Sequence, residues 1–254
     1  MIGIFDSGAG GITAIREVRR LSDAADIAFF PDRHHAPYGT KSPEELIPLV
    51  ERDVELLLSV GADTVLMACC TASTVHPYLR SDLKRVAIPI IEPTAKAAAA
   101  VTENGRIAVL ATDATVRSGA FRKSLLKQGG FTVYEFAARE LVASVEGGAR
   151  DGRLSKADEA ILDGYVKAVS ESGADTLILG CTHFPHLEGE LKKRLPRVKI
   201  ISSSREGALK LKSSTPFTGN GKTVYIGENY NAKRQKTKGI TKWENTEEAG
   251  STMP

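Results

Sequence analysis

The sequence predicts an α/β protein built from two similar units, on two observations. Short apolar runs alternate with amphipathic stretches of helical period, an alternation typical of α/β folds. One segment also occurs twice, as GADTVLMACCTAS at 61–73 and GADTLILGCTHFP at 173–185. In each copy a cysteine follows the first glycine by eight positions, after an apolar run. We therefore expect two matched strands that each lead to a thiol.

Eight apolar runs predict strands. Several are apolar on successive residues, as expected where helices cover both faces of a parallel sheet. The expected strands are Ile2–Phe5, Ile27–Phe30, Thr64–Ala68, Ile88–Ile91, Ile107–Leu110, Thr132–Phe136, Thr176–Leu179 and Val198–Ile201. A further strand is expected near Val224–Ile226, and the basic segment NAKRQKTKGITK and the polar tail after it are expected to be solvated.

Capping signals mark two of the helices between these strands. Ser42 to Glu45 form a capping box, and the helix that it opens ends at Gly61. Ser155 opens a second, similar helix that ends before Gly173. An X-Pro step at Pro93 is expected to interrupt regular structure before an alanine-rich helix. The stretch 12–21 predicts an amphipathic helix with Ile12, Ile15, Val18 and Leu21 on one stripe.

Composition narrows the class of protein. The chain has 254 residues, 42% of them hydrophobic, which is enough for one large or two small domains. A net charge of +3 is too weak a bias to indicate nucleic-acid binding. Apolar runs fall short of the roughly 20 residues of a membrane span, and the N-terminus has no export-signal pattern. With three cysteines, this predicts a cytoplasmic protein with reduced thiols and no membrane partner.

Two thiols at the ends of matched strands suggest a chemistry. Cys69 and Cys181 follow the predicted strands at their carboxyl ends, where open α/β sheets bind ligands. Amide groups at a following helix N-terminus favour a thiolate there and can hold a carboxylate. Two such units face to face would aim two thiols into one cleft, which suits stereoinversion at a carbon acid without a metal or cofactor. The alternative is that both cysteines are small core residues.

Five segments carry a resemblance to a known family: IGIFDSGAGG, PYGTKSPEE, LMACCTAS, ATDATVRSG and LILGCTHFPHL. In this order they resemble the cofactor-independent aspartate/glutamate racemases, and glutamate racemases in particular. The resemblance implies two pseudo-symmetric three-layer α/β domains with mainly parallel sheets and an active site in the cleft between them. The first domain is expected to combine 1–92 with 205–254, and the second to span 93–204. It further implies racemisation of glutamate for peptidoglycan, without cofactor or metal, by a homodimer.

By the same resemblance, Cys69 acts on D-glutamate and Cys181 on L-glutamate. Asp6 is expected beside Cys69, and His183 with Glu146 beside Cys181, where they orient protons and tune the thiols. The residues implied to bind the substrate are Asp6, Ser7, Pro37, Tyr38, Gly39, Cys70, Thr71, Thr115, Thr182 and His183. Asp6 and Ser7 are also expected to cap the helix that begins near Gly11.

The chain departs from the family at Cys70, where the family has asparagine. An amide offers stronger donors and acceptors than a thiol, so weaker substrate binding is expected here. The pair His34-His35 is also unusual, and His35 is expected near the cleft, where it could influence the pH response.

Three other functions remain open from the residues alone. The chain could be a racemase for aspartate or another acidic amino acid, or a non-catalytic binding protein with the same cleft. A zinc hydrolase could use Cys69, Cys181 and His183 with His76 or His186, although their spacing fits no standard zinc motif.

Overall fold

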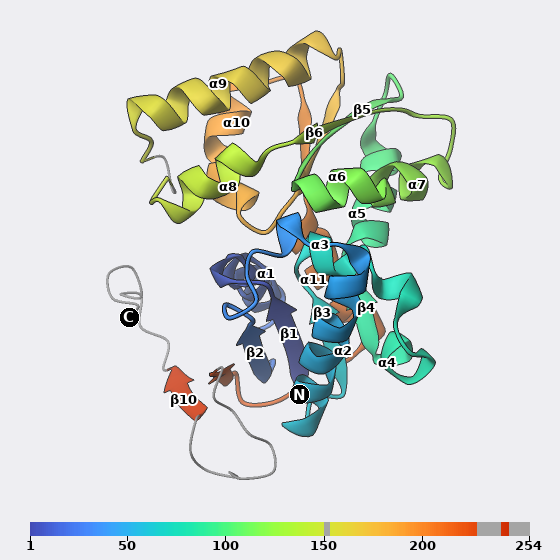
Figure 1. Ribbon diagram of the computed structural model, residues 1–254, viewed down its shortest axis with the longest axis vertical. Helices are drawn as coiled ribbons and strands as arrows, with labels where there is room; N and C mark the ends of the chain where they lie inside the picture. The colour runs from blue at the N-terminus through green and yellow to red at the C-terminus, as the bar shows by residue number, and fades with distance from the viewer. Residues whose placement is uncertain (150–152, 228–239, 244–254) are drawn as a thin grey trace.

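The protein contains two β-sheets (Figure 1). The structure is a computed structural model that describes residues 1–149, 153–227 and 240–243. The first sheet has the order β10-β9-β2-β1-β3-β4 and the second β6-β5-β7-β8. All neighbouring strands are parallel except β9 and β10. Their bounds are β1 Ile2–Asp6, β2 Ile27–Pro31, β3 Thr64–Met67, β4 Ala87–Pro89, β5 Arg106–Ala111, β6 Thr132–Ala137, β7 Thr176–Gly180, β8 Lys199–Ser202, β9 Thr223–Ile226 and β10 Ile240–Trp243.

Helices connect these strands and cover the sheets. The α-helices are α1 Ile12–Leu21, α2 Pro43–Ser59, α3 Cys70–Ser73, α4 Ser81–Val86, α5 Ile91–Val101, α6 Asp113–Ser118, α7 Ala120–Leu126, α8 Arg139–Glu146, α9 Lys156–Glu171, α10 Glu188–Arg194 and α11 Ser203–Ser214. Short 3-10 turns are η1 Ala9–Gly11, η2 Tyr38–Thr40, η3 His76–Tyr78 and η4 Phe184–Leu187. Among the described residues, no helix has the length and apolar character needed to cross a membrane.

The two sheets repeat one pattern, as the duplicated segment predicts. The order β2-β1-β3-β4 in the first sheet matches β6-β5-β7-β8 in the second. The register matches as well, because Ile2 pairs with Thr64 and Ile107 pairs with Thr176. Cys69 and Cys181 therefore follow equivalent strands, β3 and β7.

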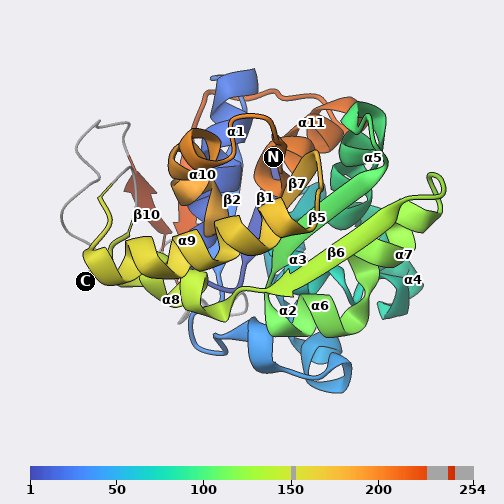
Figure 2. The ribbon, with the colours of Figure 1, turned by 90° about the horizontal axis from the view of Figure 1, so that it is seen from above.

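Helices cover both faces of the second sheet, which gives three layers, and side chains along its strands alternate between the two faces. Ala108 and Leu110 of β5 face the layer formed by α8, α9 and α10, whereas Ile107 and Val109 face α5 and α7. Figure 2 shows α9 and α5 on opposite sides of this sheet. Burial of both faces explains why the strand is apolar on successive residues.

The predicted capping signals are present. The Ser42 hydroxyl accepts the Glu45 amide at 3.3 Å, and the Glu45 carboxylate accepts the Ser42 amide at 2.8 Å. The corresponding box at Ser155 opens α9. Gly61 and Gly173 follow the two helices with φ of +96° and +67°, values that glycine adopts without steric cost.

Two predicted segments differ from the structure. β4 ends at Pro89, because Ile90 is the N-cap of α5, and its amide donates to the Ser73 hydroxyl at 3.1 Å. Pro93 lies inside the first turn of α5 and does not interrupt it, since amides of a first turn need no helical partner.

The C-terminal region contains a short strand that was not predicted. Residues 240–243 form β10, which extends the first sheet antiparallel to β9. The rest of the basic segment and tail, 228–239 and 244–254, lies outside the described residues.

Helices α5 and α11 link the two halves of the protein. Buried residues of α5 pack with β5 and α7 of the second sheet, and buried residues of α11 pack with α1 and the first sheet. Each helix therefore follows the last strand of one sheet and packs against the other. The domain boundaries near 92 and 205 stay a prediction.

Candidate active site

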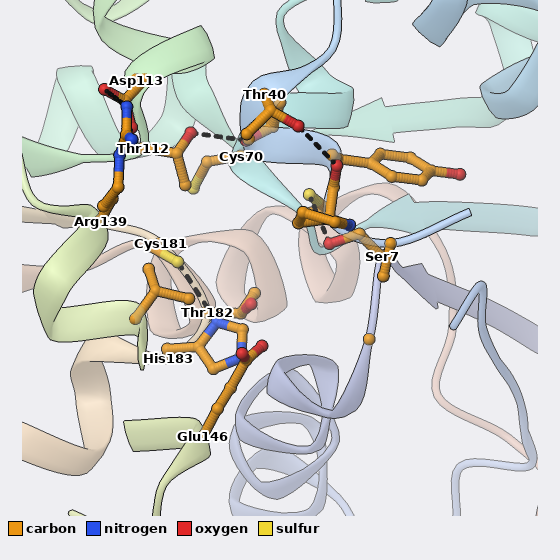
Figure 3. Close-up of a pocket in the computed structure, with 18 of the residues that line it drawn as sticks. Ser7, Thr40, Cys70, Thr112, Asp113, Arg139, Glu146, Cys181, Thr182 and His183 are labelled. Atoms are coloured by element: carbon orange, nitrogen blue, oxygen red, sulfur yellow. Dashed lines mark hydrogen bonds and ion pairs between the residues drawn. The ribbon is translucent and has the colours of Figure 1, made fainter. Parts of the chain in front are cut away.

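A cavity of about 260 Å³ lies between the carboxyl ends of the two sheets (Figure 3). Its walls include Ser7 after β1, Cys69 after β3, Thr112 after β5 and Cys181 after β7. The volume is near the lower limit of small-molecule sites, which suits a ligand of amino-acid size.

Most of the predicted site residues line this cavity. They are Ser7, Pro37, Tyr38, Gly39, Cys69, Cys70, Thr71, Glu146, Cys181, Thr182 and His183. Asp6 and Thr115 do not line it. Both are fully buried and lie behind the wall, where they contact Thr182 and Thr71 respectively.

Cys69 approaches the cavity from the first sheet. It is the N-cap of α3, where its sulfur accepts the Ala72 amide at 3.5 Å. Its thiol donates to the Ser7 hydroxyl, also at 3.5 Å. The residue is 6% exposed and lines the cavity, so a ligand in the cavity can reach the sulfur.

The expected thiolate at a helix N-terminus is wrong for Cys69. Burial and the nearby Asp6 carboxylate raise the pKa of Cys69 to about 12, despite hydrogen bonds from Ser7 and Ala72. Desolvation disfavours the charged form of the thiol, and this effect is larger than the stabilisation of the thiolate by the amides of the short helix α3. Cys69 is therefore a neutral thiol near neutral pH, the form that can donate a proton.

Cys181 has a different neighbour. His183 Nδ1 lies 3.4 Å from the Cys181 sulfur, and His183 Nε2 lies 3.3 Å from Glu146 Oε1. Although burial opposes the charge, Cys181, Glu146 and Asp6 raise the pKa of His183 to about 11. The imidazole is therefore protonated near neutral pH, with both N–H groups directed at its two partners.

Asp6 joins the two halves of the site. Its Oδ2 accepts the Gly8 amide at 3.1 Å and the Gly11 amide at 3.0 Å, and its Oδ1 accepts the Thr182 hydroxyl at 3.2 Å. Burial raises the pKa of Asp6 above its ordinary value, against these bonds and the charge of His183. The expected caps at Asp6 and Ser7 are wrong, because Gly8 and Gly11 are the N-caps of η1 and α1 and neither has a side-chain cap. Asp6 instead binds amides of this loop and links it to the second sheet.

Three threonine hydroxyls form a closed cluster between the halves. Thr71 Oγ1 lies 2.8 Å from Thr112 Oγ1 and 3.2 Å from Thr115 Oγ1, and the last two are 2.9 Å apart. Each hydroxyl can donate to one neighbour and accept from the other. Thr71 comes from the first half and the other two from the second, so this cluster ties the cavity walls together.

Cys70 lines the cavity but bonds away from the other two thiols. Its thiol donates to the Ser203 hydroxyl at 3.4 Å, and burial raises its pKa well above the ordinary value. It therefore offers the cavity a neutral sulfur where an asparagine would offer an amide.

Several lining residues were not predicted. They are Gly8, Ala36, Thr40, Thr112, Asp113, Arg139, Val142, Ala143 and Gly180. Thr112 and Asp113 directly follow β5, so the rule that ligands bind at strand carboxyl ends could have found them. Arg139 and Val142 lie seven and four positions before Glu146 on α8, so helical spacing from Glu146 could have indicated them.

The described residues contain no group of three or more histidine, cysteine or acidic side chains arranged to hold a metal ion. His76, considered for a zinc site, directs Nε2 at the carbonyl oxygens of Lys84 and Ala87, at 3.2 and 3.1 Å.

Known proteins resemble this chain in sequence and in fold. A family model for Asp/Glu/Hydantoin racemase matches residues 16–210. A glutamate racemase of Persephonella marina is 41% identical over 212 residues, 83% of this chain and 81% of that protein. The glutamate racemase of Aquifex aeolicus is 37% identical over 224 residues, 87% of this chain and 85% of that protein. The solved glutamate racemase of Bacillus anthracis has a TM-score of 0.77 and 30% identity, covering 89% of this chain and 86% of its own.

The sequence relatives and the shared fold place the protein in the class of amino-acid racemases, which are isomerases. The chain belongs to the Asp/Glu/Hydantoin racemase family. The predicted resemblance to glutamate racemases and the predicted fold class are confirmed.

Proposed function

We propose that the protein interconverts L- and D-glutamate by proton transfer between two cysteines. The observation that carries this proposal is that Cys69 and Cys181 line one small cavity from the ends of equivalent strands of the two sheets. A carbon acid bound between two thiols can lose a proton to one sulfur and receive a proton from the other, which inverts its configuration.

The two thiols have different neighbours. His183 Nδ1 lies 3.4 Å from the Cys181 sulfur, so a protonated imidazole can stabilise negative charge on that sulfur during proton transfer. Cys69 rests as a thiol because burial and Asp6 raise its pKa to about 12. In the L-to-D direction, Cys181 takes the α-proton, the electron pair stays on the substrate, and the Cys69 thiol delivers its proton to the opposite face. Turnover leaves a Cys181 thiol and a Cys69 thiolate, the form that starts the reverse reaction.

The remaining cavity groups are proposed to hold the amino acid. The Ser7 hydroxyl can donate to a carboxylate, whereas the hydroxyls of Thr71 and Thr182, whose protons bond within the protein, can accept from an ammonium group. Arg139 adds a guanidinium to the wall, which suits an acidic substrate, although it also pairs with Asp113 at 2.9 Å. Fixed donors in the cavity wall stabilise the charge that develops when the α-proton leaves.

The proposal is tested by incubating the purified protein with L- and D-glutamate in deuterated water. Racemisation with deuterium at the α-carbon is the expected result, lost in both Cys69→Ala and Cys181→Ala. Exchange with aspartate alone would assign the protein to a different acidic amino acid. Tight glutamate binding without exchange in either direction would indicate a binding protein instead.

The family resemblance leads to three further proposals, on the biosynthetic role, the cellular location and the oligomeric state. The D-glutamate product would supply peptidoglycan synthesis, the enzyme would work in the cytoplasm, and two chains would form a homodimer. Light scattering on the purified protein tests the dimer, and D-glutamate auxotrophy after deletion of the gene tests the biosynthetic role.

A further inference from the structure

A tyrosine hydroxyl beside the cavity lies between two buried carboxyl groups. Tyr38 Oη lies 2.6 Å from Asp32 Oδ2 and 2.8 Å from Asp53 Oδ2. The three residues are at most 1% exposed. A phenol carries one proton and can donate to only one of the two oxygens. Burial and the nearby aspartates raise the pKa of Tyr38, so the phenol keeps that proton. The second short contact therefore requires another proton.

Asp32 is the carboxyl that stays ionised. Its Oδ2 also accepts Arg52 Nη2 at 2.7 Å, and its Oδ1 lies 2.8 Å from His35 Nδ1. Although burial opposes ionisation, Tyr38, His35 and Arg52 lower the pKa of Asp32. The Tyr38 proton therefore points at Asp32.

Asp53 is left as the group that carries the extra proton. Its Oδ1 accepts Arg52 Nε at 3.1 Å and Arg52 Nη2 at 2.6 Å, but its Oδ2 has Tyr38 as its hydrogen-bond partner. Burial and the Asp32 charge raise the pKa of Asp53 to about 7. A neutral carboxyl with its proton on Oδ2 satisfies both contacts of Asp53, with Arg52 and with Tyr38, and leaves the Tyr38 proton for Asp32.

We propose that Asp53 is a positioning residue, held as a carboxylic acid that donates to Tyr38 while Tyr38 donates to Asp32. This directed chain fixes η2, and Pro37, Tyr38, Gly39 and Thr40 all line the cavity. Gly39 packs closely on the opposite wall, since a Cβ at this position would lie 3.1 Å from Thr112 Cβ. The orientation of Tyr38 is thereby coupled to the width of the cavity.

Loss of the Asp53 proton breaks this chain. Two carboxylates then compete for one phenol proton inside a buried cluster, and like charges at this separation repel. Among the described residues, hydrogen bonds join Asp53 to Tyr38 of η2 and to Arg52 of α2 itself, and through them to Asp32 and His35 of the segment after β2. Substrate affinity is therefore expected to fall as pH rises through about 7. This consequence rests on the proposed function, whereas the protonated carboxyl does not.

Infrared spectroscopy tests the protonation state without any activity assay. The wild-type protein at pH 6 is expected to show a carbonyl band of a protonated, buried carboxyl, which disappears in Asp53→Asn and titrates near pH 7. Glu55→Gln is the matched control, because Glu55 lies on the same helix and its side chain is 49% exposed. It should leave the band unchanged. If Asp53→Asn does not fold, Tyr38→Phe serves instead, since removing the acceptor must shift the band to higher wavenumber.

The pH profile of KM tests the positioning role. Asparagine reproduces the neutral acid, because its amide donates to Tyr38 and its carbonyl accepts from Arg52. Wild-type KM for glutamate is expected to rise about twofold to tenfold between pH 6 and 8.5, with little change in kcat. This fold-change corresponds to the net free energy of one hydrogen bond. In Asp53→Asn this rise should disappear.

Several results would overturn the inference. These are a band whose intensity at pH 6 is unchanged in Asp53→Asn, a band unshifted in Tyr38→Phe, and a KM rise that persists in Asp53→Asn but is removed by His35→Gln. The last result would assign the titration to His35. If glutamate is not racemised at all, the infrared result still decides the protonation of Asp53, so failure of the proposed function and failure of this inference are distinguishable.

Discussion

Replacing Glu146 by glutamine probes the charge on His183 beside the Cys181 sulfur. Glu146 Oε1 lies 3.3 Å from His183 Nε2, but the carboxylate side chain is 65% exposed. Exposed ion pairs contribute about 0.2–1 kcal/mol, and one pKa unit corresponds to about 1.4 kcal/mol. The pKa of His183, about 11 in the folded protein, should therefore fall by less than about one unit. The imidazole stays protonated near neutral pH, and the turnover rate should fall by no more than about fivefold.

NMR titration of the imidazole nitrogens measures this directly in the wild type and in Glu146→Gln. His183→Gln is the contrasting variant, because it removes the cation itself. A hydrogen bond to a charged group contributes about 1.5–3 kcal/mol, so its loss should slow turnover about tenfold to a hundredfold. The reasoning is refuted if His183 of the wild type titrates near its ordinary pKa, or if Glu146→Gln lowers that pKa by two units or more.

Three further predictions concern packing, binding and pH. Gly10→Ala should destabilise the protein by about 1–3 kcal/mol in thermal unfolding, since its Cβ would lie 2.3 Å from Thr182 Oγ1. Gly8→Ala, whose Cβ meets nothing within 4 Å, should be near neutral, and equal effects would contradict this account. Cys70→Asn should tighten glutamate binding about tenfold to a hundredfold in calorimetry by restoring an amide, and unchanged affinity would refute it. Asp175 accepts four hydrogen bonds, from the Thr102 and Thr176 hydroxyls and the amides of residues 103 and 104, and they lower its pKa to about 2 although desolvation opposes this. Because this pKa is depressed, its stabilising effect is present above the unfolded pKa of about 3.8 and is lost as pH falls through about 2. Because solvent screens this partly exposed carboxylate, Asp175→Asn should lower the unfolding free energy at pH 7 by no more than about 1 kcal/mol, and a difference as large at pH 2 as at pH 7 would contradict the assignment.

The positions of the two thiols were predictable because their signals are local. A repeated segment fixes the spacing from the helix-stopping glycines, Gly61 and Gly173, through a buried strand to each cysteine. Parallel strands then bring their carboxyl ends to one edge, so equivalent strands deliver equivalent residues. The capping box at Ser42 is similarly complete within four residues.

The electrostatics of the thiols could not be read from the same segments. The pKa of Cys69 depends on burial and on Asp6, which lies on another strand. The position of Cys69 before a helix N-terminus suggested a thiolate. Desolvation, which depends on the packing of the whole site, has the opposite effect on its pKa and is larger. The buried position of Asp53 could have been predicted from the sequence. Its carboxylate falls on the apolar stripe of α2, between Val50 and Leu57, where a charged residue is unusual.

The central claim is that two sulfurs act on opposite faces of one substrate carbon, and early deuterium partitioning tests it most directly. L-glutamate is mixed with enzyme in deuterated water, and both enantiomers are recovered after a small fraction has reacted. Because Cys181 removes the proton and Cys69 supplies the deuteron, the label should appear in D-glutamate while the remaining L-glutamate stays almost unlabelled. Equal labelling of both enantiomers from the first turnovers would indicate a single base that serves both faces, and would contradict the account.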